Sequence, residues 1–433
     1  MKAIDILGKV AAPAAAAIGD AARGAAMRRG IGAAAAAAML AFAPTALEAQ
    51  IAVRGETVYT MAGPAIQDGV VLIGPNGKIE RVGRASDVRI PDGYRTFTAK
   101  VVTPGLVDAH SVVGLAGYMN QEHDQDQLER SNAIQPELRA FDAYNARERL
   151  VEWLREHGVT TVHTGHGPGA VMSGQTMIVK TRGNNVGEAI VDSVTMVAMT
   201  IGPEVARNFN SRPGTTAKAI AMMRAEFLKA QEYARKREQA RDGNAPARDL
   251  KMEILARVLS GEVPALITAH RAQDILAALR LQQEFGFKLV LDGAAESYEL
   301  IDEIKAAGVP VIIHPTMARH SGSLQNATME TIRRLRDAGI QVALQSGYEG
   351  YVPKTRVVLF EAAMAAAYGL PFEQALASVT IDAARILGIA DRVGSLERGK
   401  DGDVVLFDGD PFEHTTHVCI VIIEGQVVSD GCR

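Results

Sequence analysis

The chain has 433 residues with 46 basic and 50 acidic side chains, a formal net charge of -4 and 47% hydrophobic residues. This length exceeds one small domain, and the composition argues against extensive disorder. The near balance of charges argues against a nucleic-acid-binding protein, and two cysteines are too few for a disulfide scaffold or a cysteine-rich zinc site. The sequence leaves a homo-oligomer open.

Residues 1–49 have the layout of a secretory signal peptide. After an upstream extension over residues 1–26, a basic start at 27–29 and an apolar run at 33–42 lead to small residues around a cleavage position after Ala49. The apolar run is shorter than the about 20 residues that a membrane span needs. We therefore expect a periplasmic or secreted mature protein without a stable span. An alanine-rich helix or a retained N-terminal anchor is the alternative.

Both ends of the remaining chain are rich in short β-strand patterns. Residues 51–103 alternate strands and turns, with a tight hairpin signal at 75–77, and residues 393–433 have the same pattern. These two segments around a long middle predict one small β-sandwich built from both chain ends. Cys419 and Cys432 lie in the second segment and are able to pair in an oxidising compartment, with a free thiol as the alternative.

The middle of the chain, residues 104–392, alternates short apolar strands with amphipathic helices. Eight plausible strands in a repeating βα pattern predict an α/β fold with a parallel sheet, most simply a closed (β/α)8 barrel. An open, doubly wound sheet is the alternative, but it favours a glycine-rich turn after the first strand. The turn in this chain holds residues 110–113, which contain no glycine.

Ionisable side chains gather at the predicted strand ends. They close five predicted strands or follow them directly: His110, His163, His166, His270, Asp292 and His314. The whole chain has ten histidines, so this gathering is not expected by chance, although a single such histidine is more often structural. Because catalytic groups of these barrels lie at the carboxyl ends of the strands, the pattern predicts a polar, metal-binding mouth.

Four segments carry a family likeness: residues 68–73 (DGVVLI), 77–83 (GKIERVG), 103–110 (TPGLVDAH) and 394–405 (GSLERGKDGDVV). They resemble the N-terminal β-segment, first barrel strand and C-terminal β-module of the amidohydrolase superfamily, in particular its imidazolonepropionase-like and prolidase-like branch. The resemblance covers nearly the whole mature chain and implies the same β-sandwich and barrel. It also implies metal-assisted hydrolysis, in which one or two divalent ions activate water and an aspartate on the last strand takes the proton.

The ligand set departs from the one that the resemblance implies. That set has a His-x-His pair on strand one, often a carboxylated lysine on strand four, one histidine each on strands five and six, and an aspartate on strand eight. His110 and His270 match it. Val112, Asp292 and Gly347 replace the second histidine of the pair, the strand-six histidine and the aspartate. A standard two-metal site is therefore not expected.

A mononuclear metal site remains, with His110, His270 and Asp292 as the candidate ligands and His314 as the alternative to Asp292. Three N or O ligands with an open position suit zinc, although a protein without metal is also open. Lys180 would join the site only if residues 176–180 form the fourth strand.

Two further roles need residues from the same mouth. The candidates for the missing proton-transfer group are Asp292, His163 and His314. The candidates for substrate binding are His166, Lys354 and Arg356. The two cations would hold a substrate carboxylate, and charges at the start of a helix are the alternative.

Two functions follow from these residues. The first is an amidohydrolase-like hydrolase for carbon–nitrogen bonds of cyclic amides or small peptides. The second is a catalytically inactive barrel that binds a small molecule or a protein partner. Val112 and Gly347 favour the inactive barrel, whereas the retained ionisable groups at the strand ends favour the enzyme. We prefer the enzyme.

Overall fold

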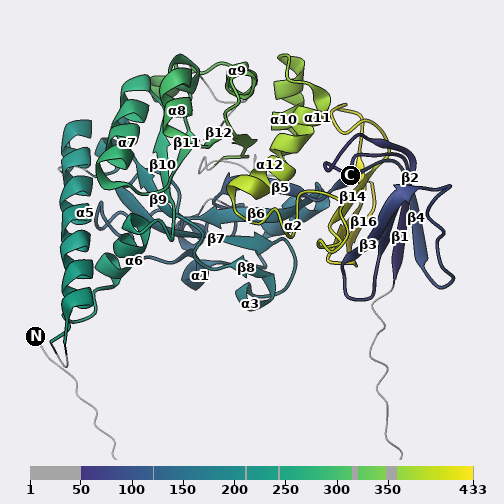
Figure 1. Ribbon diagram of the computed structural model, residues 1–433, viewed down its shortest axis with the longest axis horizontal. Coiled ribbons are helices and arrows are strands. Elements are labelled where there is room, and N and C mark those ends of the chain that lie inside the picture. Colours follow the sequence, from purple (N-terminus) through teal and green to yellow (C-terminus); the bar gives the residue numbers. More distant parts are fainter. Residues whose placement is uncertain are drawn as a thin grey trace, which may run out of the picture. The chain divides into compact units, whose positions relative to one another are not determined.

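Two β-sheets organise the chain (Figure 1). The computed structural model describes residues 50–119, 121–209, 212–241, 244–314, 320–347 and 358–432. The predicted signal peptide, residues 1–49, lies outside the described residues.

The first sheet combines strands from both ends of the chain. Its seven strands follow the order β16-β15-β14-β4-β1-β2-β3. Their bounds are β1 (Ile51–Val58), β2 (Ile66–Ile73), β3 (Ile79–Arg84), β4 (Arg95–Pro104), β14 (Val404–Phe407), β15 (Val418–Ile423) and β16 (Gln426–Asp430). β14 pairs antiparallel with β4, which joins the two ends. The predicted joint β-domain is confirmed, although its strands form one continuous sheet.

The second sheet is the barrel, with its eight strands in the order β13-β12-β11-β10-β9-β7-β6-β5. Their bounds are β5 (Leu106–Ser111), β6 (Val159–Gly165), β7 (Met172–Lys180), β9 (Val197–Thr200), β10 (Ala265–Ala269), β11 (Leu289–Gly293), β12 (Val311–Ile313) and β13 (Val342–Leu344). A bridge between Ser111 and Gly347 brings the first and last strands together, and the short β8 (Ile190–Asp192) pairs with β7. The predicted barrel is confirmed.

The sequence predicted an all-parallel barrel sheet, and this is wrong for one strand. β7 is antiparallel to both of its neighbours, β6 and β9. Only residues 166–171 connect β6 to β7, and a parallel crossover needs about a dozen residues or more, so the chain must turn back. Lys180, at the end of β7, therefore pairs with Thr161 near the start of β6, away from the mouth. The alternative metal role of Lys180 is wrong.

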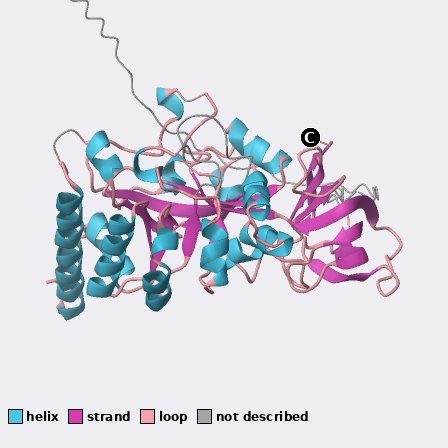
Figure 2. Cartoon of the chain, turned by 90° about the horizontal axis from the view of Figure 1, so that it is seen from above, coloured by secondary structure: helices cyan, strands magenta, loops and turns pink. Residues whose placement is uncertain are grey.

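Helices flank the strands of the barrel (Figure 2). They are α1 (Ala140–Ala143), α2 (Arg149–Glu156), α3 (Val186–Ala189), α4 (Pro203–Asn208), α5 (Thr216–Gln239), α6 (Leu250–Leu259), α7 (Ala272–Phe285), α8 (Ile301–Ala307), α9 (Thr331–Asp337), α10 (Val358–Ala367), α11 (Phe372–Ser378) and α12 (Ile381–Ile386). α5 is charged outside, but its Phe227 is buried against Phe285 and Phe287. The Thr215 hydroxyl accepts from the backbone N–H of Lys218 and caps this helix.

A buried ion network joins the barrel to the β-domain. Nζ of Lys180 lies 2.6 Å from Oδ2 of Asp403 and 3.1 Å from Oδ2 of Asp401, and all three side chains are almost completely buried. Arg392 and Lys78 also pair with Asp401. Lys180 therefore neutralises carboxylates that the C-terminal segment brings under the barrel.

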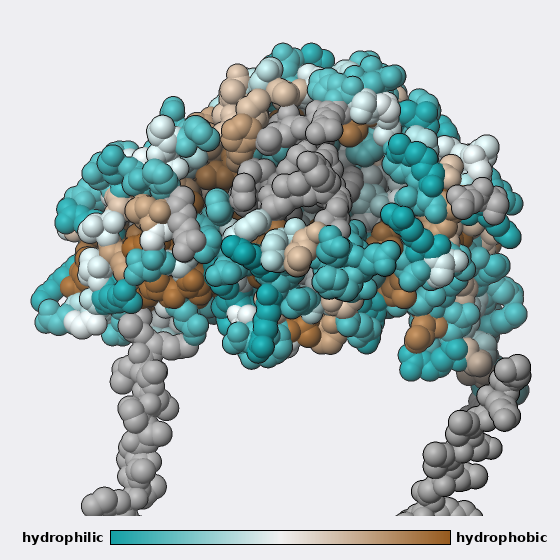
Figure 3. Space-filling view, turned by 180° about the vertical axis from the view of Figure 1, so that it is seen from behind, coloured by the Kyte–Doolittle hydropathy of each residue, from teal (hydrophilic) through white to brown (hydrophobic). Residues whose placement is uncertain are grey.

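The surface in Figure 3 is largely hydrophilic, with small hydrophobic patches. In the described chain, the large exposed hydrophobic side chains are Tyr118, Met119, Leu228, Leu250, Phe360 and Tyr368. No helix within the described ranges has the length and hydropathy to cross a membrane.

Candidate functional site

The carboxyl ends of the parallel strands bring most of the predicted site residues to one edge of the barrel. His110 lies in β5, Asp292 in β11, and His270 and His314 directly follow β10 and β12. Thr268 and Asp292 are partners in the register of β10 and β11, so their side chains are neighbours. All of these side chains are buried, which removes them from bulk water and strengthens the interactions between them.

Asp292 is the centre of a hydrogen-bond network at this edge. Its Oδ1 lies 3.0 Å from Nδ1 of His110 and accepts a 2.7 Å hydrogen bond from Nε2 of Gln345. Its Oδ2 accepts a 2.5 Å hydrogen bond from the hydroxyl of Thr268. Burial alone would raise the pKa of Asp292, but His110, Thr268 and Gln345 outweigh it and lower this pKa to about 2. Asp292 is therefore a carboxylate, and Nδ1 of His110 is the donor of their hydrogen bond.

His163 uses both of its ring nitrogens within the fold. Nδ1 donates to the carbonyl oxygen of Ala109 at 2.7 Å, and Nε2 lies 2.7 Å from the hydroxyl of Thr176. Burial, and next the neighbouring His110, lower the pKa of His163 to about 3, so its ring is neutral. The carbonyl fixes the proton on Nδ1, and Nε2 accepts from Thr176. This arrangement favours a structural role that ties β6 to β5 and β7 over the predicted proton transfer.

His270 and His166 offer ring nitrogens to a ligand. Nδ1 of His270 and both ring nitrogens of His166 are buried and have no hydrogen-bond partner in the described part of the chain. Burial lowers the pKa of His166 to about 4, and it also lowers the pKa of His270 against the pull of nearby carboxylates. Each ring is therefore neutral and carries one N–H that can donate to a substrate oxygen. His270 directly follows β10 and His166 directly follows β6, so both lie at the carboxyl ends of their strands.

The other two predicted substrate-binding residues, Lys354 and Arg356, lie outside the described residues. The acidic loop that follows β5 is described, and its Asp124 stabilises a local turn. The Asp124 carboxylate accepts from the backbone N–H of Gln121 and belongs to the short 3-10 turn η1 (Glu122–Asp124).

Two comparisons identify the family of the chain. The model of the amidohydrolase family matches residues 266–428. The crystal structure of an amidohydrolase from Thermotoga maritima MSB8 has a TM-score of 0.83 and 32% sequence identity, over 88% of this chain and 100% of that chain. The chain belongs to the amidohydrolase family.

Curated relatives agree with this assignment. Imidazolonepropionase from Rhizorhabdus wittichii is 27% identical over 388 residues, which are 82% of this chain and 92% of that protein. Amidohydrolase tasK from Hapsidospora irregularis is 26% identical over 340 residues, or 72% of this chain, but the match spans only 34% of tasK. The predicted superfamily, its imidazolonepropionase-like branch and the hydrolase class are thereby confirmed.

The described donors of this amidohydrolase do not fit a compact metal site. Zinc holds N and O ligands at about 2.0–2.2 Å, so the ligand atoms of one site lie within about 4 Å of one another. In the described part of the barrel, no three His, Cys, Asp or Glu side chains bring ligand atoms within 4.8 Å of one another. Asp292 instead makes its contacts with His110, Thr268 and Gln345. The predicted sharing of one ion by His110, His270 and Asp292 is not formed in this arrangement.

Gly347 lies where the family resemblance implies a catalytic aspartate, and the structure gives a reason for the glycine. Its φ is +91°, and a Cβ at this position would lie 2.2 Å from Cε1 of His314. Gly347→Ala should therefore lower the free energy of unfolding by about 1–3 kcal/mol, through backbone strain and displacement of His314.

Urea denaturation at neutral pH measures this loss. Gly286→Ala is the matched control, because Gly286 has a φ of +75° and a Cβ there would meet no atom within 4 Å. The control carries the backbone strain without the contact, so a larger loss is expected for Gly347→Ala. Equal losses in the two variants would contradict a role for the His314 contact.

Four polar residues that support the site were not predicted from the sequence: Thr268, Gln345, Asp108 and Ser346. Thr268 and Asp108 each precede a site histidine by two positions, and side chains two apart share a face of a strand. That spacing was the available signal. The carboxylate of Asp108 accepts from the backbone N–H of Ser346 at 3.0 Å and from its hydroxyl, which ties β5 to the end of β13.

The lowered pKa values of the buried histidines should make the stability of this amidohydrolase depend on pH. The folded state lowers the pKa values of His163 and His166 to about 3 and about 4, and it also lowers that of His270. Between these values and about 6.5, the unfolded chain binds protons that the folded chain does not, so the free energy of unfolding should fall as pH drops from 7 to 4. Asp108 has the opposite effect, because burial raises its pKa to about 6 and the folded chain then binds a proton that the unfolded chain does not.

Urea denaturation across this pH range measures the slope. His166→Gln removes one of the contributing groups and should flatten the slope by at most about 1.4 kcal/mol per pH unit. A stability that increases toward pH 4 would show that the histidines do not control this dependence.

Proposed function

We propose that this amidohydrolase hydrolyses a carbon–nitrogen bond in a cyclic amide or a small peptide. The family membership and the imidazolonepropionase relative support the reaction class. The single observation that carries the proposal is the contact between His110 and Asp292 at the carboxyl edge of the barrel. A carboxylate that accepts from one ring nitrogen of a histidine fixes the tautomer and orientation of the ring and leaves the other nitrogen as the proton acceptor.

His110 supplies the proton transfer in this proposal. Asp292 holds the proton of His110 on Nδ1, so Nε2 carries the lone pair that takes a proton from the attacking water. The same nitrogen then delivers this proton to the leaving amide nitrogen. Thr268 and Gln345 keep Asp292 in place and ionised during both steps. This assignment replaces the aspartate that the family resemblance implies at Gly347.

His270 is the proposed donor to the carbonyl oxygen of the substrate. Its ring is neutral and buried, and one N–H can be directed at the oxygen that becomes negative as water adds. His166 is the proposed second contact to the substrate, from the loop after β6. His314 lies next to Gly347 and remains a second candidate for the proton transfer. Because the described donors do not fit a shared ion, we assign no step to the predicted zinc.

A substrate panel tests this function. Purified protein is assayed for hydrolysis of imidazolones, other cyclic amides and dipeptides, and binding of each compound is measured by calorimetry. The natural protein should turn over a panel compound, and His110→Ala should lose this turnover. His414→Ala is the control, since it changes an exposed histidine of the β-domain and should keep the turnover. Turnover that survives unchanged in His110→Ala would overturn the assignment.

The alternative function is that of a catalytically inactive binding protein. The observation that favours it is the replacement of two family positions by Val112 and Gly347, neither of which can bind a metal or a proton. Binding of a panel compound without turnover under any condition would support this alternative.

We also propose that the mature protein is periplasmic or secreted. The layout of residues 1–49 supports export, and so does the disulfide between Cys419 and Cys432, since disulfides persist mainly in oxidising compartments. N-terminal sequencing of protein from the native source should begin near Gln50. A native N-terminus at Met1 would contradict export.

A further inference from the structure

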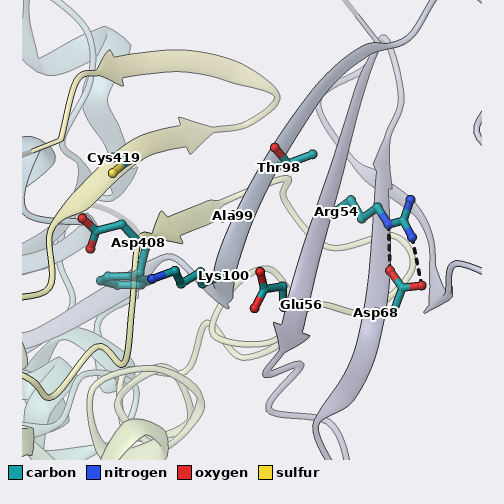
Figure 4. Close-up of a pocket in the computed structure, with 9 residues that line it drawn as sticks. Arg54, Glu56, Asp68, Thr98, Ala99, Lys100, Asp408 and Cys419 are labelled. Atoms are coloured by element: carbon teal, nitrogen blue, oxygen red, sulfur yellow. Dashed lines mark hydrogen bonds and ion pairs between the residues drawn. The ribbon is translucent and has the colours of Figure 1, made fainter.

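A second cluster of metal-capable side chains lies in the β-domain, away from the barrel edge. Cys419 of β15 forms a disulfide with Cys432, which follows β16. The backbone N–H of Gly431 donates to the carbonyl oxygen of Cys419 at 2.9 Å and holds the two segments together. Figure 4 shows Cys419 beside Asp408, which directly follows β14. Three strands of one sheet therefore position this cluster.

Asp408 and His417 add an oxygen and a nitrogen to the two sulfur atoms. Nδ1 of His417 lies 3.0 Å from Oδ2 of Asp408, and the backbone N–H of His417 donates to Oδ1 at 2.7 Å. Both carboxylate oxygens of Asp408 therefore face the His417 segment. His417 lies two positions before Cys419, and the pairing of β15 with β14 shifts register between Val418 and Ile420, at Cys419.

Three of these four side chains, all but His417, already bring their ligand atoms close to one another. Ligand atoms of Asp408, Cys419 and Cys432 all lie within 4.8 Å of one another, and in the described chain no other group of three such side chains does so. Zinc takes sulfur at about 2.3 Å and nitrogen or oxygen at about 2.0–2.2 Å in a tetrahedron. The cluster is half-buried to exposed, so ion and solvent have access to it.

We propose that reduction of the Cys419–Cys432 disulfide creates a zinc-type site with ligands from Cys419, Cys432, His417 and Asp408. A dithiol reductant supplies two electrons and two protons, becomes a disulfide itself and leaves two thiols on the protein. The ion then displaces one proton from each thiol and binds two thiolates, one imidazole and one carboxylate. In the oxidised protein the sulfur atoms are bonded to each other and do not hold the ion. The site can therefore bind the ion only when this disulfide is reduced.

Only a small rearrangement separates the two states. The sulfur atoms must part from their bonded distance to the about 3.7 Å that two thiolates of one zinc tetrahedron require. Cys432 is exposed and lies two positions beyond the end of β16, so it can move without disturbing the sheet. Cys419 lies in β15, and Asp408 and His417, which directly adjoin β14 and β15, are held to each other by backbone hydrogen bonds.

Zinc titration of one protein in two redox states tests the proposal. One sample is reduced with a phosphine, the other is kept oxidised, and both compete for zinc with a chromophoric chelator without oxygen. The reduced sample should bind one zinc ion per chain more than the oxidised sample. Any ion bound at the barrel edge appears in both samples, so the difference is independent of the proposed hydrolase function.

Variants identify the ligands. Cys419→Ser and Cys432→Ser should lose the additional zinc ion, His417→Ala should bind it less tightly, and His414→Ala, three positions earlier, should match the natural protein. Cobalt in place of zinc should give thiolate-to-metal charge-transfer absorption in the reduced natural protein alone. Equal zinc binding in both redox states, or an additional ion that persists in Cys419→Ser, would overturn the proposal.

Discussion

Asp292→Asn should lower kcat/KM by about 10²–10⁴-fold on whichever panel substrate is hydrolysed, the range typical for loss of a positioned proton-transfer group. The amide side chain presents no carboxylate to Nδ1 of His110, so the ring loses the partner that fixes its tautomer and orientation. Asp292 contacts His110, Thr268 and Gln345, and the proposed substrate contacts come from other residues. Most of the loss is therefore expected in kcat, with KM changed little.

Steady-state kinetics of the purified variant measures both parameters. Asp302→Asn is a suitable control, since it removes an exposed carboxylate from the first turn of α8 and should keep full activity. If Asp292→Asn retained the kcat of the natural protein, proton transfer by His110 with Asp292 would be wrong. A loss confined to KM would instead assign Asp292 to substrate binding.

Lys180→Met should lower the free energy of unfolding by about 3–5 kcal/mol, because it removes one member of a buried ion network and leaves the others uncompensated. Asp403 and Asp401 lie 2.6 Å and 3.1 Å from Nζ of Lys180, and both carboxylates are almost completely buried. Arg392 and Lys78 contact only Asp401, so Asp403 would keep no cationic partner among those that the structure describes.

Urea denaturation at pH 7 measures this loss. Arg54→Ala serves as the control, since it breaks the exposed pair with Asp68 shown in Figure 4 and should change stability little. A loss below about 1 kcal/mol for Lys180→Met would place this pair among ordinary surface ion pairs and contradict its role in joining the barrel to the β-domain.

The architecture was accessible from the sequence because hydrophobic periodicity reports which segments are strands and helices. The joint β-domain and the eight barrel strands were predicted from that pattern. The direction of β7 was not, because periodicity carries no information on strand direction. The length of the connection over residues 166–171 carried that information, since six residues cannot make a parallel crossover. A strand that turns back in this way carries Lys180 away from the mouth, where it pairs with Thr161.

The site was partly accessible for the same reason. The positions of His110 and Asp292 at strand ends predicted that they would lie at one edge. Nδ1 of His110 is 3.0 Å from Oδ1 of Asp292. What each side chain contacts depends on register between strands that are distant in the sequence. Thr268 reaches Asp292 because β10 and β11 pair in that register, and His163 is held by Ala109 and Thr176 of neighbouring strands. The sequence alone cannot distinguish a histidine held in this way from one that is available for catalysis.

Hydrolysis by metal-stripped protein tests the central claim most directly, namely that His110 with Asp292 performs the proton transfer. The protein is treated with a chelator, its metal content is measured, and the substrate panel is assayed on the same sample. We predict turnover that is independent of metal content and that is lost in His110→Ala. Turnover that disappears with the metal and returns with added zinc, or binding of a panel compound without any turnover, would contradict the claim.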